Sequence, residues 1–138
     1  MARIMAIDFG MKRCGLAVTD ELQLIASGLT TVPTTEIMDF LTEYLKEEKV
    51  DVIVLGAPKR MNNEVSAVEE NIVRFRESLT AQFPEVKIDR QDERFTSKMA
   101  FQTMIDGGLG KKKRKNKALV DQISATLILQ GYLTKNTL

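Results

Sequence analysis

One short, continuous apolar run, at residues 52–55, constrains the fold more than any other feature of the sequence. Strands that are buried on both faces of a parallel sheet have this composition. Apolar residues recur at helical spacing on both sides of the run: Ile37, Leu41 and Leu45 before it, and Val68, Ile72, Phe75 and Leu79 after it. The pattern predicts a buried strand that is reached and left through helices, as in an α/β fold.

The other strands are predicted from apolar runs that end at turn residues. We expect them at residues 4–9, 16–19, 24–32 and 86–90, in addition to 51–56. Gly10 and Gly15 should bracket a hairpin loop, because glycine tolerates the positive φ that tight turns need. The first three strands are therefore expected to pair antiparallel.

Helices are predicted where apolar side chains recur at intervals of three and four residues. The first should be capped by Thr34 or Thr35 and end near Lys49, and the second should begin at Ser66 in a capping box. A third is expected over residues 96–106. The fourth, over residues 118–132, is apolar nearly all round, which predicts that it is buried.

The order of these elements predicts a five-stranded mixed sheet, with three antiparallel strands plus two parallel ones, flanked by helices. Right-handed crossovers would place the first strand at the centre of the sheet. Ligands of open α/β sheets gather beyond the carboxyl ends of central strands. With 138 residues, the chain is expected to form a single domain over residues 1–138.

The composition restricts the chemistry. The chain has no histidine and one cysteine, Cys14, which removes the commonest general base, every Ser-His or Cys-His pair and any cysteine-rich zinc site. Carboxylates that hold a hard cation such as Mg²⁺ remain a route to hydrolysis, because the metal lowers the pKa of its bound water. The apolar runs are short and no export signal is recognised, so a cytoplasmic location without membrane contact is expected.

Three acidic residues lie at the ends of elements that this topology brings together. Asp8 closes the first strand, Glu93 follows the last strand, and Asp121 lies in the final helix on a face of small and apolar residues. Each has another explanation, because Asp8 can cap the glycine turn, and Glu93 and Asp121 suit the first turns of helices. Three clustered carboxylates repel one another unless cations lie between them, so we interpret these acids as a metal site.

Basic residues are concentrated beside the last of these acids. The run at residues 111–117 holds six of the 20 Lys and Arg residues, so the rest of the chain, with 14 basic and 19 acidic residues, is net negative. Such a run is typical of phosphate contact, although a solvated segment that aids solubility has the same composition. The residues expected to contact nucleic acid are Lys12, Arg13, Arg94, Lys111, Lys112, Lys113, Arg114, Lys115 and Lys117.

Four motifs in order resemble the YqgF/RuvX family over essentially the whole chain. They are DFGMKRCGLAVTD (residues 8–20), LGAP (55–58), DERFTS (92–97) and VDQISA (120–125). Each motif is short, but their succession is specific. The resemblance implies a ribonuclease H-like fold, a cytoplasmic bacterial protein and a nuclease that matures the 5′ end of 16S ribosomal RNA, with Asp8, Glu93 and Asp121 as its acidic active site.

The same family is also labelled as Holliday junction resolvases, so a four-way DNA junction is the alternative substrate. Resolvases of the related RuvC type use four acids, and Ser124 stands here where the fourth would lie, one turn after Asp121. This difference favours RNA cleavage. The loop at residues 59–64 also departs from the family pattern, which leaves its part in substrate binding open.

The resulting hypothesis is hydrolysis of a phosphodiester by water held on Mg²⁺ or Mn²⁺, with Asp8 bridging two cations and the basic residues holding the nucleic-acid backbone. We expect ribosomal precursor RNA or structured DNA as partner, and a monomer or homodimer. Two other classes stay open: a non-catalytic nucleic-acid-binding module, and a nucleotide-binding relative of the actin-like ATPases. The short chain argues against the latter, because those proteins need a second domain.

Overall fold

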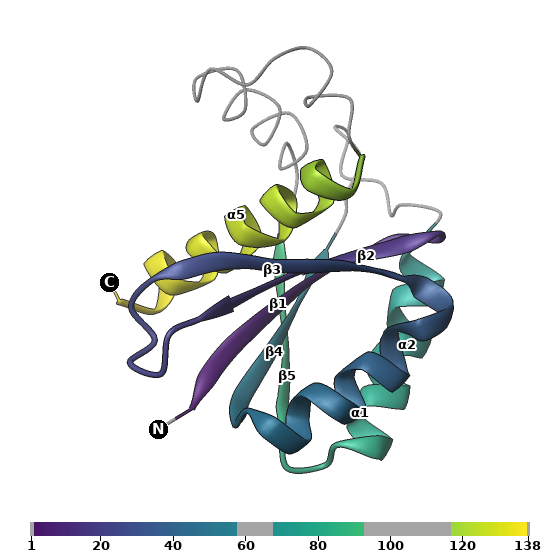
Figure 1. Ribbon diagram of the computed structural model, residues 1–138, viewed down its shortest axis with the longest axis horizontal. Coiled ribbons are helices and arrows are strands. Elements are labelled where there is room, and N and C mark those ends of the chain that lie inside the picture. Colours follow the sequence, from purple (N-terminus) through teal and green to yellow (C-terminus); the bar gives the residue numbers. More distant parts are fainter. Residues whose placement is uncertain (1, 58–67, 93–116, 138) are drawn as a thin grey trace.

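The computed structural model describes residues 2–57, 68–92 and 117–137 (Figure 1). Its strands are β1 (Arg3–Phe9), β2 (Arg13–Thr19), β3 (Ala26–Pro33), β4 (Val50–Ala57) and β5 (Lys87–Asp92). Its helices are the 3-10 turn η1 (Thr34–Glu36), α1 (Ile37–Glu47), α2 (Glu69–Gln82) and α5 (Lys117–Thr137). The helix predicted over residues 96–106 lies outside the described residues, and so does Ser66, the predicted start of the second helix.

The five strands form one mixed sheet in the order β3-β2-β1-β4-β5. β1 pairs antiparallel with β2, and β2 pairs antiparallel with β3. On its other side β1 pairs parallel with β4, and β4 pairs parallel with β5. The predicted mixed sheet with a central first strand is therefore confirmed, and Figure 1 shows β1 between β2 and β4.

The sheet lies between two layers of helices, because alternate residues of each strand face opposite sides. Met5 and Ile7 of β1 belong to the apolar cluster that includes residues of α1 and α2, whereas Ile4 and Ala6 belong to the cluster that includes residues of α5. Figure 1 shows α1 and α2 on one side of the sheet and α5 on the other. The position of a residue within its strand therefore decides which helices it meets.

Gly15 lies inside β2, so the prediction that it ends a hairpin loop is wrong. The loop is shorter, and β2 already begins at Arg13. A Cβ atom at Gly15 would overlap the backbone carbonyl group of Asp121 in α5. The glycine is therefore needed for the close approach of helix to strand, and not for a turn.

α5 buries one face only, so the prediction that it is buried all round is wrong. Its buried residues recur at helical spacing and face the sheet: Ser124, Ala125, Ile128, Leu129 and Tyr132. Gln130 and Thr134 are exposed on the opposite face. The sheet therefore covers one side of α5. In the described part of the chain, no helix is long and apolar enough to cross a membrane.

The predicted cap of the first helix at Thr34 or Thr35 is also wrong. These residues form η1, and neither η1 nor α1 has a side-chain cap. The Thr34 hydroxyl instead donates to the Gly10 carbonyl at 2.7 Å, and the Thr34 N–H donates to the Lys12 carbonyl at 3.0 Å. Thr34 therefore fastens the loop between β1 and β2, which is the loop that follows Asp8.

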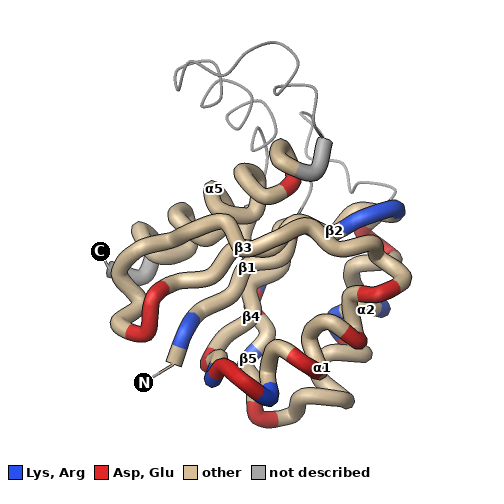
Figure 2. The backbone as a smooth tube through the Cα atoms, in the orientation of Figure 1, with Lys and Arg blue, Asp and Glu red and all other residues tan. Residues whose placement is uncertain are grey.

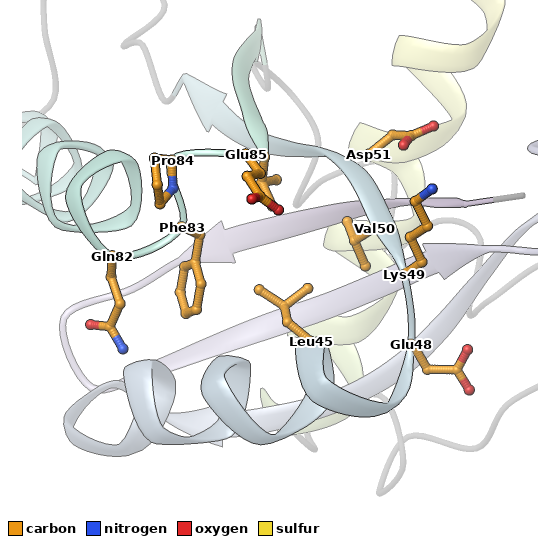
Figure 3. A pocket seen from close by; sticks show the side chains of 10 residues that line it. Leu45, Glu48, Lys49, Val50, Asp51, Gln82, Phe83, Pro84 and Glu85 are labelled. Atoms are coloured by element: carbon orange, nitrogen blue, oxygen red, sulfur yellow. The ribbon is translucent and has the colours of Figure 1, made fainter.

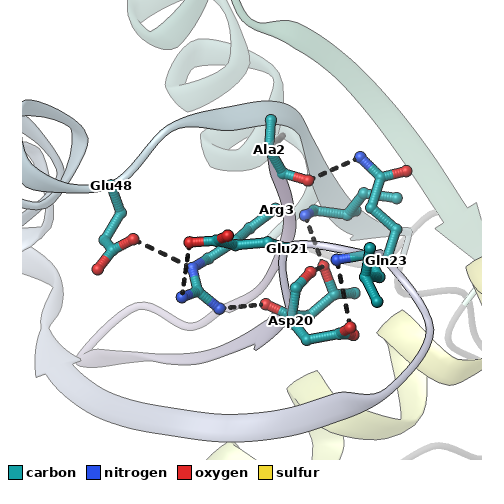
Figure 4. Close-up of polar contacts among 9 residues, drawn as sticks. Ala2, Arg3, Asp20, Glu21, Gln23 and Glu48 are labelled. Atoms are coloured by element: carbon teal, nitrogen blue, oxygen red, sulfur yellow. Dashed lines mark hydrogen bonds and ion pairs between the residues drawn. The ribbon is translucent and has the colours of Figure 1, made fainter.

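The opposite, amino-terminal end of β1 is fixed by a separate set of polar contacts (Figure 4). The Arg3 guanidinium donates to the Thr19 carbonyl at 2.9 Å and pairs with Glu48 at 3.2 Å. The Asp20 carboxylate accepts backbone N–H groups of the turn between β2 and β3, from Leu22, Leu24 and Ile25. Both ends of the central strand are therefore anchored through side chains.

Candidate active site

Asp8 is placed by the alternation of β1. It follows Ile4 and Ala6 on the side of the sheet that α5 covers, and it is half-buried. In the antiparallel ladder Asp8 lies opposite Gly15 of β2. A carboxylate therefore occupies the last position of the central strand that faces α5.

Asp121 reaches the same place from α5. No side chain separates strand and helix at Gly15, and a Cβ atom there would lie 3.0 Å from the Cβ atom of Asp121. Asp8 and Asp121 therefore flank one glycine, the first beside it in the ladder and the second on the helix above it. The sequence predicts that these acids meet, but it does not reveal that Gly15 is the contact between them.

Arg13, the first residue of β2, forms an ion pair with Asp121. Its Nε donates to Oδ2 of Asp121 at 2.6 Å, and the two side chains are 33% and 23% exposed. Short, charge-assisted contacts of this kind are the strong ones. The sequence predicts nucleic-acid contact for Arg13, and the carboxylate partner was missed because the two residues lie far apart in the chain.

The buried thiol of Cys14 lies within electrostatic range of both acids. Burial raises the pKa of Cys14, and the negative charges of Asp8 and Asp121 raise it as well, while a hydrogen bond with the Thr34 hydroxyl and one with the backbone of Gly10 act in the opposite direction. Two carboxylates that act on one side chain also repel each other. Arg13 offsets part of that repulsion through its pair with Asp121.

Glu93, the third predicted acid, lies outside the described residues. The strand before it, β5, ends at Asp92 and runs parallel to β4, which runs parallel to β1. Among the side chains within the described ranges, no three acids or thiols gather into a metal site. Two of the three predicted ligands are therefore placed, and the role of Glu93 stays a prediction.

Lys12 and Arg13 place positive charge in and beside the loop between β1 and β2. Figure 2 shows this basic segment apart from the acidic residues of α1, and Lys12 is exposed. The other predicted nucleic-acid contacts, which are Arg94, Lys111, Lys112, Lys113, Arg114 and Lys115, lie outside the described residues. α5 begins at Lys117, whose side chain is not among those described.

A hollow of about 440 Å³ opens at the other end of the parallel strands (Figure 3). It is lined by the end of α1, the start of β4 and the connection from α2 to β5, including Leu45, Val50 and Phe83. These residues lie at the amino-terminal end of β4, whereas Asp8 lies near the carboxyl end of β1. The hollow is therefore separate from Asp8 and Asp121.

The curated relatives of this chain include three named "Putative pre-16S rRNA nuclease". The relative from Christiangramia forsetii is 59% identical over 96% of this chain and 98% of its own length. One from Bacteroides fragilis is 57% identical over 96% of both chains, and one from Porphyromonas gingivalis is 53% identical over the same shares. Each of these matches spans nearly the whole of this chain.

Two solved structures of Thermus thermophilus RuvC are similar in fold. One, a complex with a Holliday junction substrate, has a TM-score of 0.59 at 20% identity and covers 99% of this chain and 98% of its own. The other has a TM-score of 0.57 at 16% identity, over 98% and 96%. The predicted ribonuclease H-like fold is thereby confirmed. The family model described as "RuvX: Holliday junction resolvase" matches residues 2–135, and the chain belongs to this family, as its four motifs predict.

Proposed function

We propose that this chain is a nuclease that hydrolyses phosphodiester bonds and processes the 5′ end of precursor 16S ribosomal RNA. Relatives that share more than half of its residues are named for cleavage of this RNA. The observation that carries the proposal is the meeting of Asp8 and Asp121 around Gly15, near the carboxyl end of the central strand. Ligands of open α/β sheets bind at this position.

The donor set at this position fits Mg²⁺ or Mn²⁺. Asp8 and Asp121 offer hard carboxylate oxygens, and Glu93 would add a third carboxylate. A bound cation of this kind supplies an acidified water and stabilises the charge on the leaving oxygen of a phosphodiester. Because the chain has no histidine, its residues act here as ligands and phosphate contacts, and not as an imidazole base.

The phosphate backbone would be held by basic residues next to the acids. Lys12 is exposed, and Arg13 lies directly beside Asp121. Lys111, Lys112, Lys113, Arg114, Lys115 and Lys117 would extend this contact, and Arg94 would lie beside Glu93. Affinity for RNA should then fall steeply as salt rises, because each phosphate contact releases counterions.

The test is cleavage of precursor 16S RNA by the Asp8→Asn variant in Mg²⁺ and in Mn²⁺. The rate should fall by more than about 100-fold, because losing a ligand costs more than losing a residue that only orients one. Asp39→Asn is the matched control, since Asp39 is an exposed acid on α1. Full activity of Asp8→Asn would refute the assignment, and RNA binding without turnover in the unmodified protein would identify a non-catalytic module.

A second candidate is cleavage of four-way DNA junctions, because the matching family model carries that description. Ser124, one turn after Asp121, is uncharged and only 2% exposed. It therefore offers no fourth carboxylate of the kind that RuvC-type resolvases use. Parallel assays on a four-way junction and on the RNA precursor separate the two substrates, and we expect the RNA to be cut faster.

A further inference from the structure

The ion pair between Arg13 and Asp121 joins two residues that the proposed function assigns to different ligands. Asp121 would hold a divalent cation, and Arg13 would hold a phosphate of the nucleic acid. In the structure they hold each other, with 2.6 Å between Nε and Oδ2. Asp121 is thus already paired with a positive group, the Arg13 guanidinium, and Arg13 with a negative group, the Asp121 carboxylate.

The two engagements compete. A guanidinium and a divalent cation both seek the oxygens of Asp121, and a carboxylate and a phosphate both seek the donors of Arg13. The formal charges favour an exchange when both ligands arrive. Among the described residues, Asp8, Asp121 and Arg13 together carry one negative charge. Without Arg13 the two acids carry two, so its departure makes the site more attractive to a divalent cation.

Only side chains need to move for this exchange. Arg13 opens β2, where its backbone pairs with Pro33 of β3, and the backbone of Asp121 is seated against Gly15. Both side chains keep some exposure to solvent, at 33% and 23%. A long arginine side chain rooted in a strand can therefore turn from the carboxylate toward a phosphate while Asp121 stays beside Asp8.

We propose that Arg13 couples nucleic-acid binding to metal binding: phosphate draws the guanidinium off Asp121, and the carboxylate thus released takes the divalent cation. The inference rests on the proposed function. Coupling of this kind is reciprocal, so the cation must strengthen nucleic-acid binding by the same factor as nucleic acid strengthens cation binding. The site would then load its cation fully only when substrate is present.

The test measures the affinity of a fluorescently labelled RNA hairpin by anisotropy, with and without Ca²⁺ at constant ionic strength. Ca²⁺ takes the place of Mg²⁺ because its looser coordination disfavours turnover, and gels check that the RNA stays intact. We expect Ca²⁺ to tighten RNA binding by at least about fivefold in the unmodified protein. In Arg13→Gln the ratio of the RNA affinities with and without Ca²⁺ should fall to about one. Without RNA, Ca²⁺ should bind to this variant more tightly than to the unmodified protein.

Lys12→Gln is the matched control, because it removes the neighbouring positive charge without touching the ion pair. It should weaken RNA binding in both conditions and keep the parental ratio. The coupling is overturned if Ca²⁺ tightens RNA binding by Arg13→Gln as much as by the unmodified protein. It is also overturned if Ca²⁺ leaves RNA binding by the unmodified protein unchanged. If Asp8→Asn still abolishes cleavage in that case, the nuclease assignment stands and only the exchange fails; if no cation binds at all, both fail.

Discussion

Gly15→Ala is the substitution that most directly probes how Asp8 and Asp121 are held together. The added methyl group would overlap the backbone carbonyl of Asp121 and lie 3.0 Å from its Cβ atom. Backbone atoms cannot swing aside as a flexible side chain can, so β2 and α5 must separate by about 1 Å. Overpacking of this kind costs roughly 3 kcal/mol, which corresponds to a fall in Tm of about 10 °C for a domain of this size.

The effect on activity should exceed the effect on stability. α5 carries Asp121, so lifting the helix moves one carboxylate while the other stays in β1. A displacement of about 1 Å in a reacting geometry can cost about 100-fold in rate. Cleavage assays well below the Tm of the variant would separate this loss from unfolding, and calorimetry would give the Tm.

Gly131→Ala is the matched control for that substitution. Gly131 also lies in α5, but among the described residues a Cβ there would approach only the side chain of Gln91, whose flexible end places Nε2 at 3.0 Å. Alanine in a helix is better than glycine by about 0.5–1 kcal/mol, so this variant should be as stable as the parent or slightly more. If Gly15→Ala matched Gly131→Ala in both Tm and rate, the close approach at Gly15 could not be what positions Asp121.

Two further predictions concern the scaffold. Glu69→Gln should lower the free energy of unfolding by about 1–2 kcal/mol in a denaturant titration. It breaks the pair of both Glu69 oxygens with Arg90, at 2.8 and 2.9 Å, and leaves a half-buried guanidinium. Glu43→Gln, in an exposed pair with Lys46, should change the free energy of unfolding by less than about 0.5 kcal/mol, and equal losses in the two variants would contradict the burial argument. Hydrogen bonds from backbone N–H groups hold the pKa of Asp20 below its ordinary value of 3.8; the N–H of Ile25 contributes most, followed by that of Leu24. The order that Asp20 gives the turn should therefore persist as pH falls past 3.8 and disappear only as pH passes below the folded pKa; NMR signals of the turn that change at or above pH 3.8 would refute this.

The fold was predictable because its signals are local. The apolar run at residues 52–55 and the helical spacing on either side of it specify a strand between two crossovers, and the handedness of crossovers then places β1 at the centre. Asp8 interrupts an apolar strand one residue before its end, which marks it as unusual without any knowledge of the rest. The boundaries of the elements were less well predicted, as Thr34 shows: its hydroxyl bonds to Gly10 and caps no helix.

The contacts that assemble the candidate site were not predictable from the sequence, because they join residues far apart in the chain. Glycine is typical of turns, yet Gly15 lies in a strand, where its missing side chain lets the backbone of α5 pack closely against β2. Arg13 belongs to a basic segment, yet its Nε lies on a carboxylate of the last helix. Periodicity describes which side of an element is apolar, but it carries no information on which distant residue faces a given position.

The claim on which the whole account depends is that Asp8 and Asp121 share a divalent cation. Anomalous diffraction from crystals grown with Mn²⁺ and a short RNA tests it most directly. We predict a peak about 2.0–2.3 Å from carboxylate oxygens of both residues, with the guanidinium of Arg13 turned away from Asp121. A peak elsewhere, or none, with Arg13 still on Asp121, would contradict the account.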